Sequence, residues 1–277
     1  MHASAPSPEF TFAFRPVDET LTADQRWSSW LTVERGARGP QPRPDWVVTD
    51  DSAVDTELGV LKTGKEADVF LVERAARTSG KSVVMAAKRY RSAEHRTFHR
   101  SAAYTEGRRV RDSRDMRAMA KGTAHGRAVA AGQWAAAEWQ ALRSLWSAGF
   151  PVPYPVQIDG TEILMEYVSV DGAAAPRLAQ TRPGPALRDA WFEQVRDAMA
   201  ALARRQITHG DLSAYNILAA GERLVIIDLP QVVDIIGNPQ GMDLLMRDCT
   251  NVCTWFRARG ADVDEHELFG ELVAQAY

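Results

Sequence analysis

The chain has 277 residues, of which 45% are hydrophobic and 25% are charged, and its net charge is −3 at neutral pH. A chain of this length and composition is expected to be globular, with one large domain or two lobes. The small net charge excludes a general attraction to nucleic acids or membranes, so any such partner would have to bind a local patch.

Signals for membranes, secretion and metal clusters are weak throughout the sequence. No apolar run approaches the roughly 20 residues needed to cross a bilayer, and the N-terminus lacks the charged start and apolar core of a secretory signal. The cysteines, Cys249 and Cys253, suit one face of a helix better than a zinc site, which would need more ligands nearby. We therefore expect a cytoplasmic protein without a membrane partner.

The N-terminal region differs in composition from the rest of the chain. Residues 1–44 are rich in Pro, Ser, Gly and Arg and show no sustained hydrophobic period. This composition favours a mostly disordered arm. In the alternative interpretation, Trp27 and Trp30 dock a short helix on the folded body. The folded domain is expected to span residues 45–277.

Strands and helices are expected in a mixed order after this arm. Residues 58–74 have strand-like ends around a Gly-Lys-Glu turn, and residues 81–90 are the expected hairpin partner. A strong helix is predicted over 133–148, where Trp139, Leu142 and Trp146 form an apolar stripe and Gly149 ends the helix. An extended connector, a strand and three helices are then predicted over residues 150–156, 161–168, 186–206, 239–260 and 264–275, in that order.

A concentrated basic segment lies between these elements. Residues 88–127 contain 12 Lys and Arg against 4 acidic residues, which gives the segment a net charge of +8. One interpretation is a solvated loop. The other is a docking surface for RNA or another polyanion, because clustered arginines supply the contacts that phosphates need.

Polar residues cluster beside apolar runs in residues 208–231, THGDLSAYNILAAGERLVIIDLPQ. Asp211 is followed five positions later by Asn216, and Asp228 ends the strand-like run twelve positions further on. A carboxylate such as Asp211 can deprotonate a hydroxyl, while an amide oxygen and a second carboxylate hold a divalent cation against phosphate oxygens. Mg²⁺ suits such a set, because it takes few protein ligands.

Each of these residues also has a purely structural interpretation. Asp211 could cap a helix, and Asn216 could close an Asx turn. The functional interpretation is favoured for these two and for Asp228, because a carboxylate between apolar segments is costly without a partner. His209 is expected to be a buried, hydrogen-bonded scaffold residue. Ser213 is either a turn former or a contact to nucleotide or metal.

Four motifs occur in an order that resembles a known enzyme family. GKEADVF, AAKRY, HGDLSAYNIL and IIDLPQ resemble the RIO-type atypical serine/threonine protein kinases, in particular the Rio1-like branch, over residues 58–277. The segments WAAAEWQAL, GFPVPYPV and RDCTNVCTWF are also similar to that branch. The Ala- and Arg-rich composition suggests a high-GC bacterial source.

The resemblance implies an α+β, two-lobed protein-kinase-like fold. The N-lobe, residues 45–164, is expected to hold an antiparallel sheet and a helix. A hinge over residues 165–168 then leads to a mainly helical C-lobe, residues 169–277. ATP is expected to bind between the lobes.

The resemblance also implies roles for individual residues. Lys88 contacts the α- and β-phosphates of ATP and pairs with Glu138, while the loop over residues 63–69 covers the phosphates. Adenine lies against the hinge, where Glu166 and Val168 act through backbone groups. The expected cofactor-binding residues are Thr63, Gly64, Lys65, Val69, Lys88, Glu138, Met165, Glu166, Val168 and Ser213; the catalytic residues are Asp211 and Lys88; and the ligands of Mg²⁺, with Mn²⁺ as an alternative, are Asn216 and Asp228.

The sequence departs from the family at one position that affects the site. Family members usually carry Ser two residues after the metal-binding Asp, whereas this chain has Pro230, which leaves the local loop geometry open. As in RIO kinases, no long activation segment or Ala-Pro-Glu motif follows Asp228. The usual platform for a peptide acceptor is therefore missing from the sequence.

Two alternatives to a protein kinase remain at this stage. Small-molecule phosphotransferases of the aminoglycoside or choline kinase type share a His-Gly-Asp motif, but they commonly place His where this chain has Ser213. An ATPase that switches conformation on RNA or a ribosomal particle is the second alternative, and the basic segment suits it. The protein that accepts phosphate is not identified by the sequence.

Overall fold

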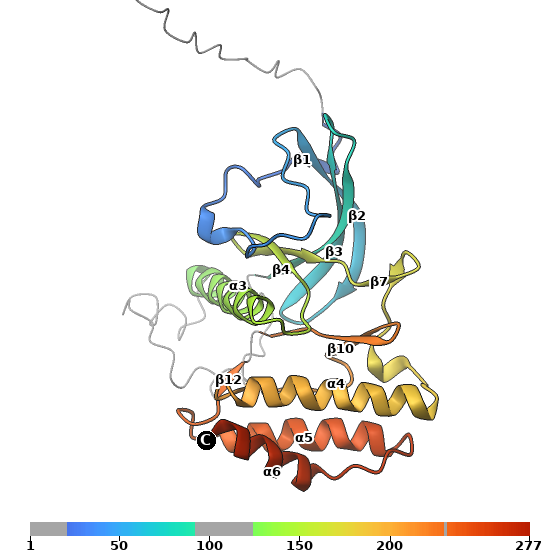
Figure 1. Cartoon of the computed structure of the whole chain (residues 1–277). Helices are drawn as coiled ribbons and strands as arrows, with labels where there is room; N and C mark the ends of the chain where they lie inside the picture. The colour runs from blue at the N-terminus through green and yellow to red at the C-terminus, as the bar shows by residue number, and fades with distance from the viewer. Residues whose placement is uncertain (1–20, 92–123, 230–231) are drawn as a thin grey trace, which may run out of the picture.

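The structure is a computed structural model that describes residues 21–91, 124–229 and 232–277, without the side chains of residues 124–128. Residues 1–20 of the predicted arm, most of the basic segment and Pro230 lie outside the described residues. The described chain has the predicted two-lobed α+β architecture, with a sheet in one lobe and helices in the other (Figure 1).

The N-lobe is built on a six-stranded sheet in the order β1-β2-β3-β4-β6-β5, in which every neighbouring pair is antiparallel. Strand β4 carries an apolar run, VVMAA, as is typical of a strand that is covered on both faces. Val72, Met85 and Ala87 are buried. The strands are β1 (Gln25–Trp27), β2 (Ala53–Thr63), β3 (Ala67–Ala76), β4 (Ser82–Tyr90), β5 (Pro155–Asp159) and β6 (Glu162–Glu166).

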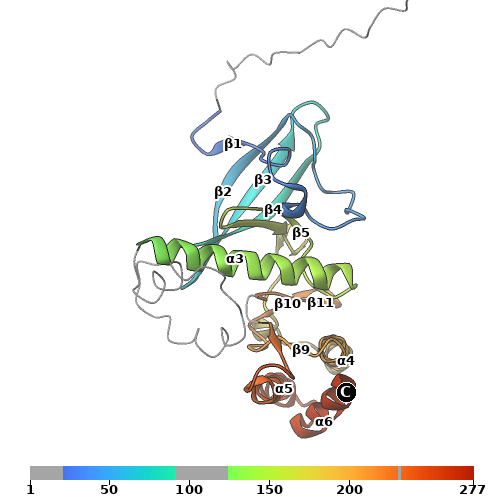
Figure 2. The same cartoon turned by 90° about the vertical axis from the view of Figure 1, so that its left-hand side faces the viewer.

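Helix α3 (Ala124–Ser147) lies between the sheet and the C-lobe (Figure 2). It starts well before the predicted position, because alanines continue the helix toward its N-terminus. Its buried residues Ala135, Trp139 and Leu142 recur at helical spacing. Gly149 has φ of +77°, and its amide donates to the Trp146 carbonyl, so the helix ends in the left-handed conformation that glycine accepts.

In its described residues, the C-lobe has three α-helices and three short two-stranded sheets. Helix α5 carries a strongly one-sided apolar face, with Leu245, Cys249, Val252 and Phe256 buried. Asp264 caps the N-terminus of α6, because its side chain accepts hydrogen bonds from the backbone amides of His266 and Glu267. The elements are α4 (Pro185–Ala203), α5 (Gly241–Arg257), α6 (Glu265–Ala276), β7 (Ser169–Val170), β8 (Ala173–Ala174), β9 (Ile207–Thr208), β10 (Ile217–Ala220), β11 (Arg223–Ile226), β12 (Val233–Asp234) and the 3-10 turns η1 (Arg35–Ala37) and η2 (Leu178–Gln180).

Residues 21–44 are folded onto the N-lobe, so the prediction of disorder does not hold for this part of the arm. Strand β1 pairs with β2, and Trp30 is only 3% exposed. The burial of one large aromatic ring provides enough apolar contact to order a polar, proline-rich segment. Trp27 remains 45% exposed and therefore contributes little to this docking.

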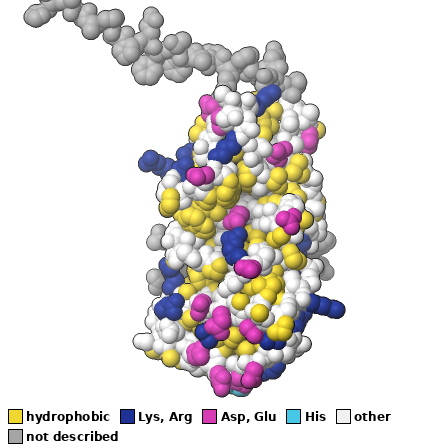
Figure 3. Space-filling view, turned by 45° about the vertical axis from the view of Figure 1, so that its right-hand side comes forward, with side chains coloured by type: hydrophobic (Ala, Val, Ile, Leu, Met, Phe, Trp, Pro, Cys, Tyr) yellow, Lys and Arg dark blue, Asp and Glu magenta, His cyan; other side chains and the backbone are white. Residues whose placement is uncertain are grey.

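The surface of the described chain carries charges of both signs. Figure 3 shows acidic and basic side chains mixed over the lower part of one face, with hydrophobic side chains exposed in its middle and upper parts. Large exposed hydrophobic residues include Leu58 and Val60 of β2 and Tyr215. No helix in the described ranges is long and apolar enough to cross a membrane.

Candidate active site

The loop between β9 and β10 contains the first polar cluster, and a buried carboxylate fixes its backbone. Asp248 of α5 is fully buried and accepts hydrogen bonds from the Gly210 amide at 2.8 Å, the Leu212 amide at 2.7 Å and the Thr208 hydroxyl at 2.7 Å. Burial raises the pKa of Asp248, while these donors and His209 act in the opposite direction. The sequence analysis did not identify this residue.

Asp211 and Asn216 lie next to each other in this loop. The Asn216 side-chain amide donates to the Asp211 carbonyl oxygen at 2.8 Å, which leaves the amide oxygen of Asn216 as its remaining ligand atom. Arg247 of α5 donates to the Gly210 carbonyl, and its guanidinium lies 3.5 Å from the Asp211 carboxylate. Arg247 could not be identified from the sequence either, because it is 36 residues from Asp211 and no motif links the two positions.

His209 and Ser213 occupy structural positions in the same loop. His209 is 1% exposed, and its Nε2 lies 3.1 Å from the Ile227 carbonyl, which connects the loop to the residue before Asp228. The Ser213 carbonyl accepts a hydrogen bond from the Asn216 amide at 2.9 Å. Ser213 thus closes the turn that presents Asn216, one of its two predicted roles.

Asp228 lies directly opposite this loop, after strand β11. Its φ is +68°, an unusual value for a residue other than glycine, and such strained conformations are concentrated at functional sites. Half of its side chain is exposed. The nearby Lys88 ammonium is the main reason why the pKa of Asp228 lies below its usual range.

Lys88 on β4 connects the two lobes. Its ammonium lies 2.7 Å from the Glu138 carboxylate and 2.8 Å from the Asp228 carboxylate. Burial alone would lower the pKa of Lys88, but these two carboxylates outweigh it and raise the pKa well above its ordinary value. Lys88 is therefore a fixed cation between the sheet and the C-lobe.

Glu138 has a second partner that the sequence analysis missed. Glu138 is 2% exposed, and the hydroxyl of Tyr90 donates to its other carboxylate oxygen. Burial and the adjacent Glu138 charge both raise the pKa of Tyr90, so its hydroxyl stays protonated and can donate. Tyr90 follows Lys88 by two positions on β4, and this spacing could have identified it, because residues i and i+2 share one face of a strand.

The turn between β2 and β3 carries the residues predicted to cover phosphates. The Gly64 amide donates to the Ala67 carbonyl at 3.1 Å, and a Cβ on Gly64 would lie 2.6 Å from that oxygen. Only glycine therefore fits this tight turn. Thr63 and Lys65 are exposed on either side of it, and the partly buried Val69 lies in β3 opposite Lys62.

The predicted hinge runs from the end of β6 into the C-lobe. The Glu166 amide donates to the Tyr154 carbonyl, and the Val168 carbonyl accepts from the Ala175 amide, so these two backbone groups are already engaged. Within the described residues, no hydrogen bond is donated by the Val168 amide. Met165, near the end of β6, is partly buried.

The chain matches the RIO domain family over residues 68–268. It belongs to the RIO family. A protein of Haloferax volcanii named RIO-type serine/threonine-protein kinase Rio1 is 34% identical over 225 residues, which cover 80% of this chain and 70% of that protein. The rio1 kinase of Dictyostelium discoideum is 30% identical over 210 residues, which cover 73% of this chain and 33% of that protein.

Solved structures show the same fold. The Rio2 kinase of Chaetomium thermophilum, in a complex with ADP/Mg²⁺ and phosphoaspartate, matches this RIO chain with a TM-score of 0.52 and 20% identity, covering 79% of this chain and 65% of that one. The predicted RIO fold and kinase family are thus confirmed. The relatives named here are archaeal and eukaryotic, and the bacterial source suggested by composition stays a prediction.

The donor set of this RIO chain fits a hard divalent cation. The Asn216 amide oxygen and the half-exposed Asp228 carboxylate offer oxygen atoms of the kind that Mg²⁺ binds, and Mg²⁺ commonly takes its other ligands from water and phosphate. Within the described part of the chain, no cluster of three or more His, Cys, Asp or Glu could hold a metal by protein ligands alone.

Proposed function

We propose that this RIO kinase transfers the γ-phosphate of ATP to a serine or threonine hydroxyl of a protein. The observation that carries the proposal is the position of Lys88, which contacts Glu138 in the N-lobe and Asp228 in the C-lobe, with Asp211 and Asn216 in the adjoining loop. A cation fixed between two lobes matches the place where nucleotide phosphates bind in kinases.

The proposed reaction uses Asp211 as the residue that receives the acceptor's proton. The hydroxyl oxygen attacks the γ-phosphorus, the bond from that phosphorus to the bridging oxygen breaks, and ADP leaves with the bridging oxygen. Asp211 orients the hydroxyl and takes its proton. Arg247 of α5 lies 3.5 Å from the Asp211 carboxylate and helps to hold it in position.

The remaining residues hold the nucleotide. Lys88 neutralises negative charge on the phosphates, and Glu138 keeps its ammonium in place. Asn216 and Asp228 would hold Mg²⁺, which when bound offsets the charge on the β- and γ-phosphates. The Val168 amide is available to adenine at the hinge, and the Gly64 turn lies over the phosphates.

A second candidate function is an ATPase that switches conformation on RNA or a ribosomal particle. The net charge of +8 in residues 88–127 favours it, because clustered arginines bind phosphate backbones. The buried thiols of Cys249 and Cys253 agree with a cytoplasmic location for either function.

ATP turnover by the purified protein distinguishes the two candidates. The wild type and the Asp228→Ala variant are incubated with Mg²⁺ and γ-labelled ATP, and both free phosphate and labelled protein are followed. Label on protein that is lost in the variant supports the kinase. Free phosphate without stable label supports the ATPase, and the lack of both signals in the wild type indicates a nucleotide-binding scaffold or a missing partner.

A further inference from the structure

A folded segment outside the matched RIO domain wraps the N-lobe. The N-terminal strap, defined as residues 28–40, precedes the family match, which begins at residue 68. The strap is organised around the buried ring of Trp30. The Arg38 guanidinium lies 5.4 Å from the centre of that ring and donates to the carbonyls of Leu31 and Val33 at 3.1 Å. This side chain therefore holds the strap in a fixed shape.

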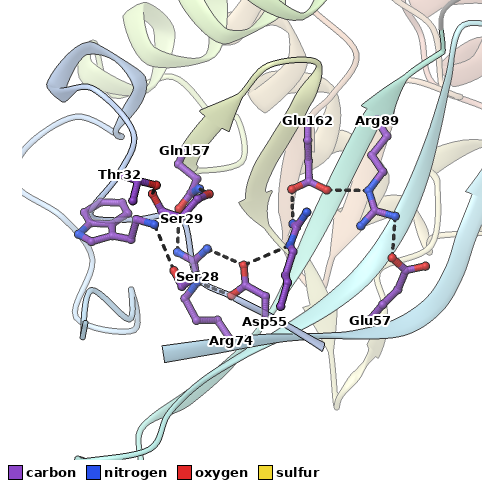
Figure 4. Close-up of polar contacts among 11 residues, drawn as sticks. Ser28, Ser29, Thr32, Asp55, Glu57, Arg74, Arg89, Gln157 and Glu162 are labelled. Carbon is purple, nitrogen blue, oxygen red and sulfur yellow. Dashed lines mark hydrogen bonds and ion pairs between the residues drawn. The ribbon is translucent and has the colours of Figure 1, made fainter. Parts of the chain in front are cut away.

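A buried polar network connects the strap to the sheet. The Gln157 side chain donates to the Ser29 hydroxyl at 2.9 Å, and its amide oxygen accepts from Arg74 at 2.9 Å. Arg74 is fully buried and makes two hydrogen bonds to Asp55, at 2.6 and 2.8 Å. Figure 4 shows these contacts on one side of the sheet, beside the Glu162–Arg89–Glu57 chain. Such an interior network tolerates few other positions of Ser29.

The strap passes so close to β5 that a side chain is excluded. The Gly39 amide donates to the Val156 carbonyl at 2.8 Å. A Cβ on Gly39 would lie 2.1 Å from the Pro155 carbonyl oxygen and 2.6 Å from the Tyr154 hydroxyl oxygen. Gly36 is different, because no atom lies within 4 Å of the position of its Cβ. Gly39 and Gly36 therefore form a matched pair for substitution.

The strap also contacts the helix that carries Glu138. The Gly36 carbonyl accepts a hydrogen bond from the Trp139 indole at 3.2 Å and another from the Arg143 guanidinium at 3.1 Å. Trp139 directly follows Glu138 in the chain and is 2% exposed. In both Figure 1 and Figure 2 the turn η1, which contains Gly36, lies against α3.

We propose that the N-terminal strap positions α3 and thereby fixes Glu138 against Lys88. Both partners of Glu138, Lys88 and Tyr90, are on β4, so the pairing depends on where α3 lies relative to the sheet. The strap connects the sheet to α3. Gly39 is hydrogen-bonded to strand β5 of the sheet, and Gly36 is hydrogen-bonded to Trp139, which follows Glu138 on α3. The catalytic consequence rests on the proposed role of Lys88 in phosphoryl transfer.

The test displaces the strap without changing α3 or the nucleotide site. Gly39→Ala should lower kcat for phosphoryl transfer or ATP hydrolysis by about tenfold or more, since small misplacements of catalytic groups have large effects on rate. KM for ATP should change much less. Gly36→Ala is the matched control, and its kcat should equal that of the wild type. Equal kcat for Gly39→Ala and the wild type would overturn the proposal.

A double-mutant cycle tests whether the strap acts through Trp139. Trp139→Phe removes one of the two donors to the Gly36 carbonyl, and its effect on kcat should not add to that of Gly39→Ala. Trp191→Phe is the control, since Trp191 is 4% exposed and donates its indole N–H to the Glu222 carbonyl at 3.1 Å, far from α3 in the sequence. Its effect should add to that of Gly39→Ala. Additive effects for Trp139→Phe would contradict the proposed route.

Hydrogen exchange provides a readout that does not depend on activity. In the full-length protein, Gly39→Ala should speed amide exchange in α3, whereas Gly36→Ala should leave it unchanged. If the wild type shows no turnover, this measurement still decides the proposal while the proposed function fails. Unchanged exchange in α3 for Gly39→Ala would show that the strap does not hold the helix.

Discussion

Lys88 keeps its charge although only 13% of its side chain is exposed, and two carboxylates make this possible. Its contact with Asp228 connects the two lobes. Phosphates placed beside Lys88 would compete with Asp228 for the same ammonium, whereas Glu138 is enclosed and remains in place. The side chain of Glu138 is 2% exposed and that of Asp228 is 50% exposed. We therefore expect Glu138 to keep holding Lys88 when phosphates bind, and Asp228 to release it.

Tyr90→Phe tests the support of Glu138. The substitution removes a donor to a buried carboxylate, and hydrogen bonds to charged groups contribute about 1.5–3 kcal/mol. We expect the free energy of unfolding to fall by about that amount, with weaker ATP binding, as measured by denaturant unfolding and by nucleotide titration. Tyr277→Phe is the control, because Tyr277 is 83% exposed. If Tyr90→Phe keeps the stability and the ATP affinity of the wild type, Tyr90 does not support Glu138.

Asp211→Asn tests the proton acceptor. The amide keeps the size of the side chain but cannot take a proton at neutral pH, so phosphoryl transfer should fall by about 10²–10⁴-fold. Mg-ATP binding should stay largely intact, since the proposed metal ligands are Asn216 and Asp228. Transfer of labelled phosphate and nucleotide titration are measured together. Asp189→Asn, an exposed acid on α4, is the control, and full activity of Asp211→Asn would exclude its role as the base.

Local sequence pattern indicated Asp211, Asn216 and Asp228, because they lie in or follow a recognisable loop or strand, whereas Lys88 was indicated by the resemblance to RIO kinases. Their roles toward ATP stay predictions, although the structure places Lys88 against Asp228 and Asn216 against Asp211. Arg247 and Asp248 were missed for a physical reason. They act from α5 on a loop more than thirty residues away in the sequence, and helical periodicity reports only which face is buried.

At the scale of elements, α5 serves as the support of the catalytic loop. Asp248 is a buried charge on an otherwise apolar helix face, and three donors from the loop compensate for its burial. The segment from Thr208 to Leu212 is thereby fixed to a helix, in addition to the pairing of Thr208 with β12. A rigid element thus positions Asp211, as active sites require.

Asp248→Ala should damage stability and catalysis together. Three donors would lose their acceptor, and each unsatisfied buried group costs about 1–3 kcal/mol. We expect a loss of about 3 kcal/mol or more in the free energy of unfolding and a large fall in kcat of the remaining folded protein. Asp243→Ala, an exposed acid in the first turn of α5, is the control and should change stability by less than about 1 kcal/mol. Similar effects of the two substitutions would contradict this role of Asp248.

Element types were predicted better than element limits. The helices over α3, α4, α5 and α6 and the hairpin β3–β4 follow from periodicity and turn residues. The start of α3 was misplaced because helix-forming alanines continue into a segment whose charge suggested a loop. Residues 21–44 were misjudged because a single buried ring, Trp30, outweighs the composition of the segment. Such long-range burial is not visible in a local window.

At the scale of the whole molecule, charge is distributed unevenly along the chain. The net charge is −3, although residues 88–127 alone carry +8. The rest of the protein is therefore acidic, and it would repel a nucleic acid at most other places. Any affinity for RNA should accordingly depend on this one segment and should weaken steeply as salt increases.

Replacing Arg111, Arg114 and Arg117 by Gln tests this dependence. Each lost phosphate contact should reduce the slope of log K against log salt by about 0.7 for single-stranded RNA, so three contacts would flatten it by about 2. RNA binding is measured at several salt concentrations for the full chain. The matched control replaces three exposed arginines of the C-lobe, Arg182, Arg204 and Arg205, and should keep the wild-type slope. If the first variant also keeps the wild-type affinity and slope, the basic segment is a solvated loop, and the RNA-dependent ATPase loses its main support while the kinase is unaffected.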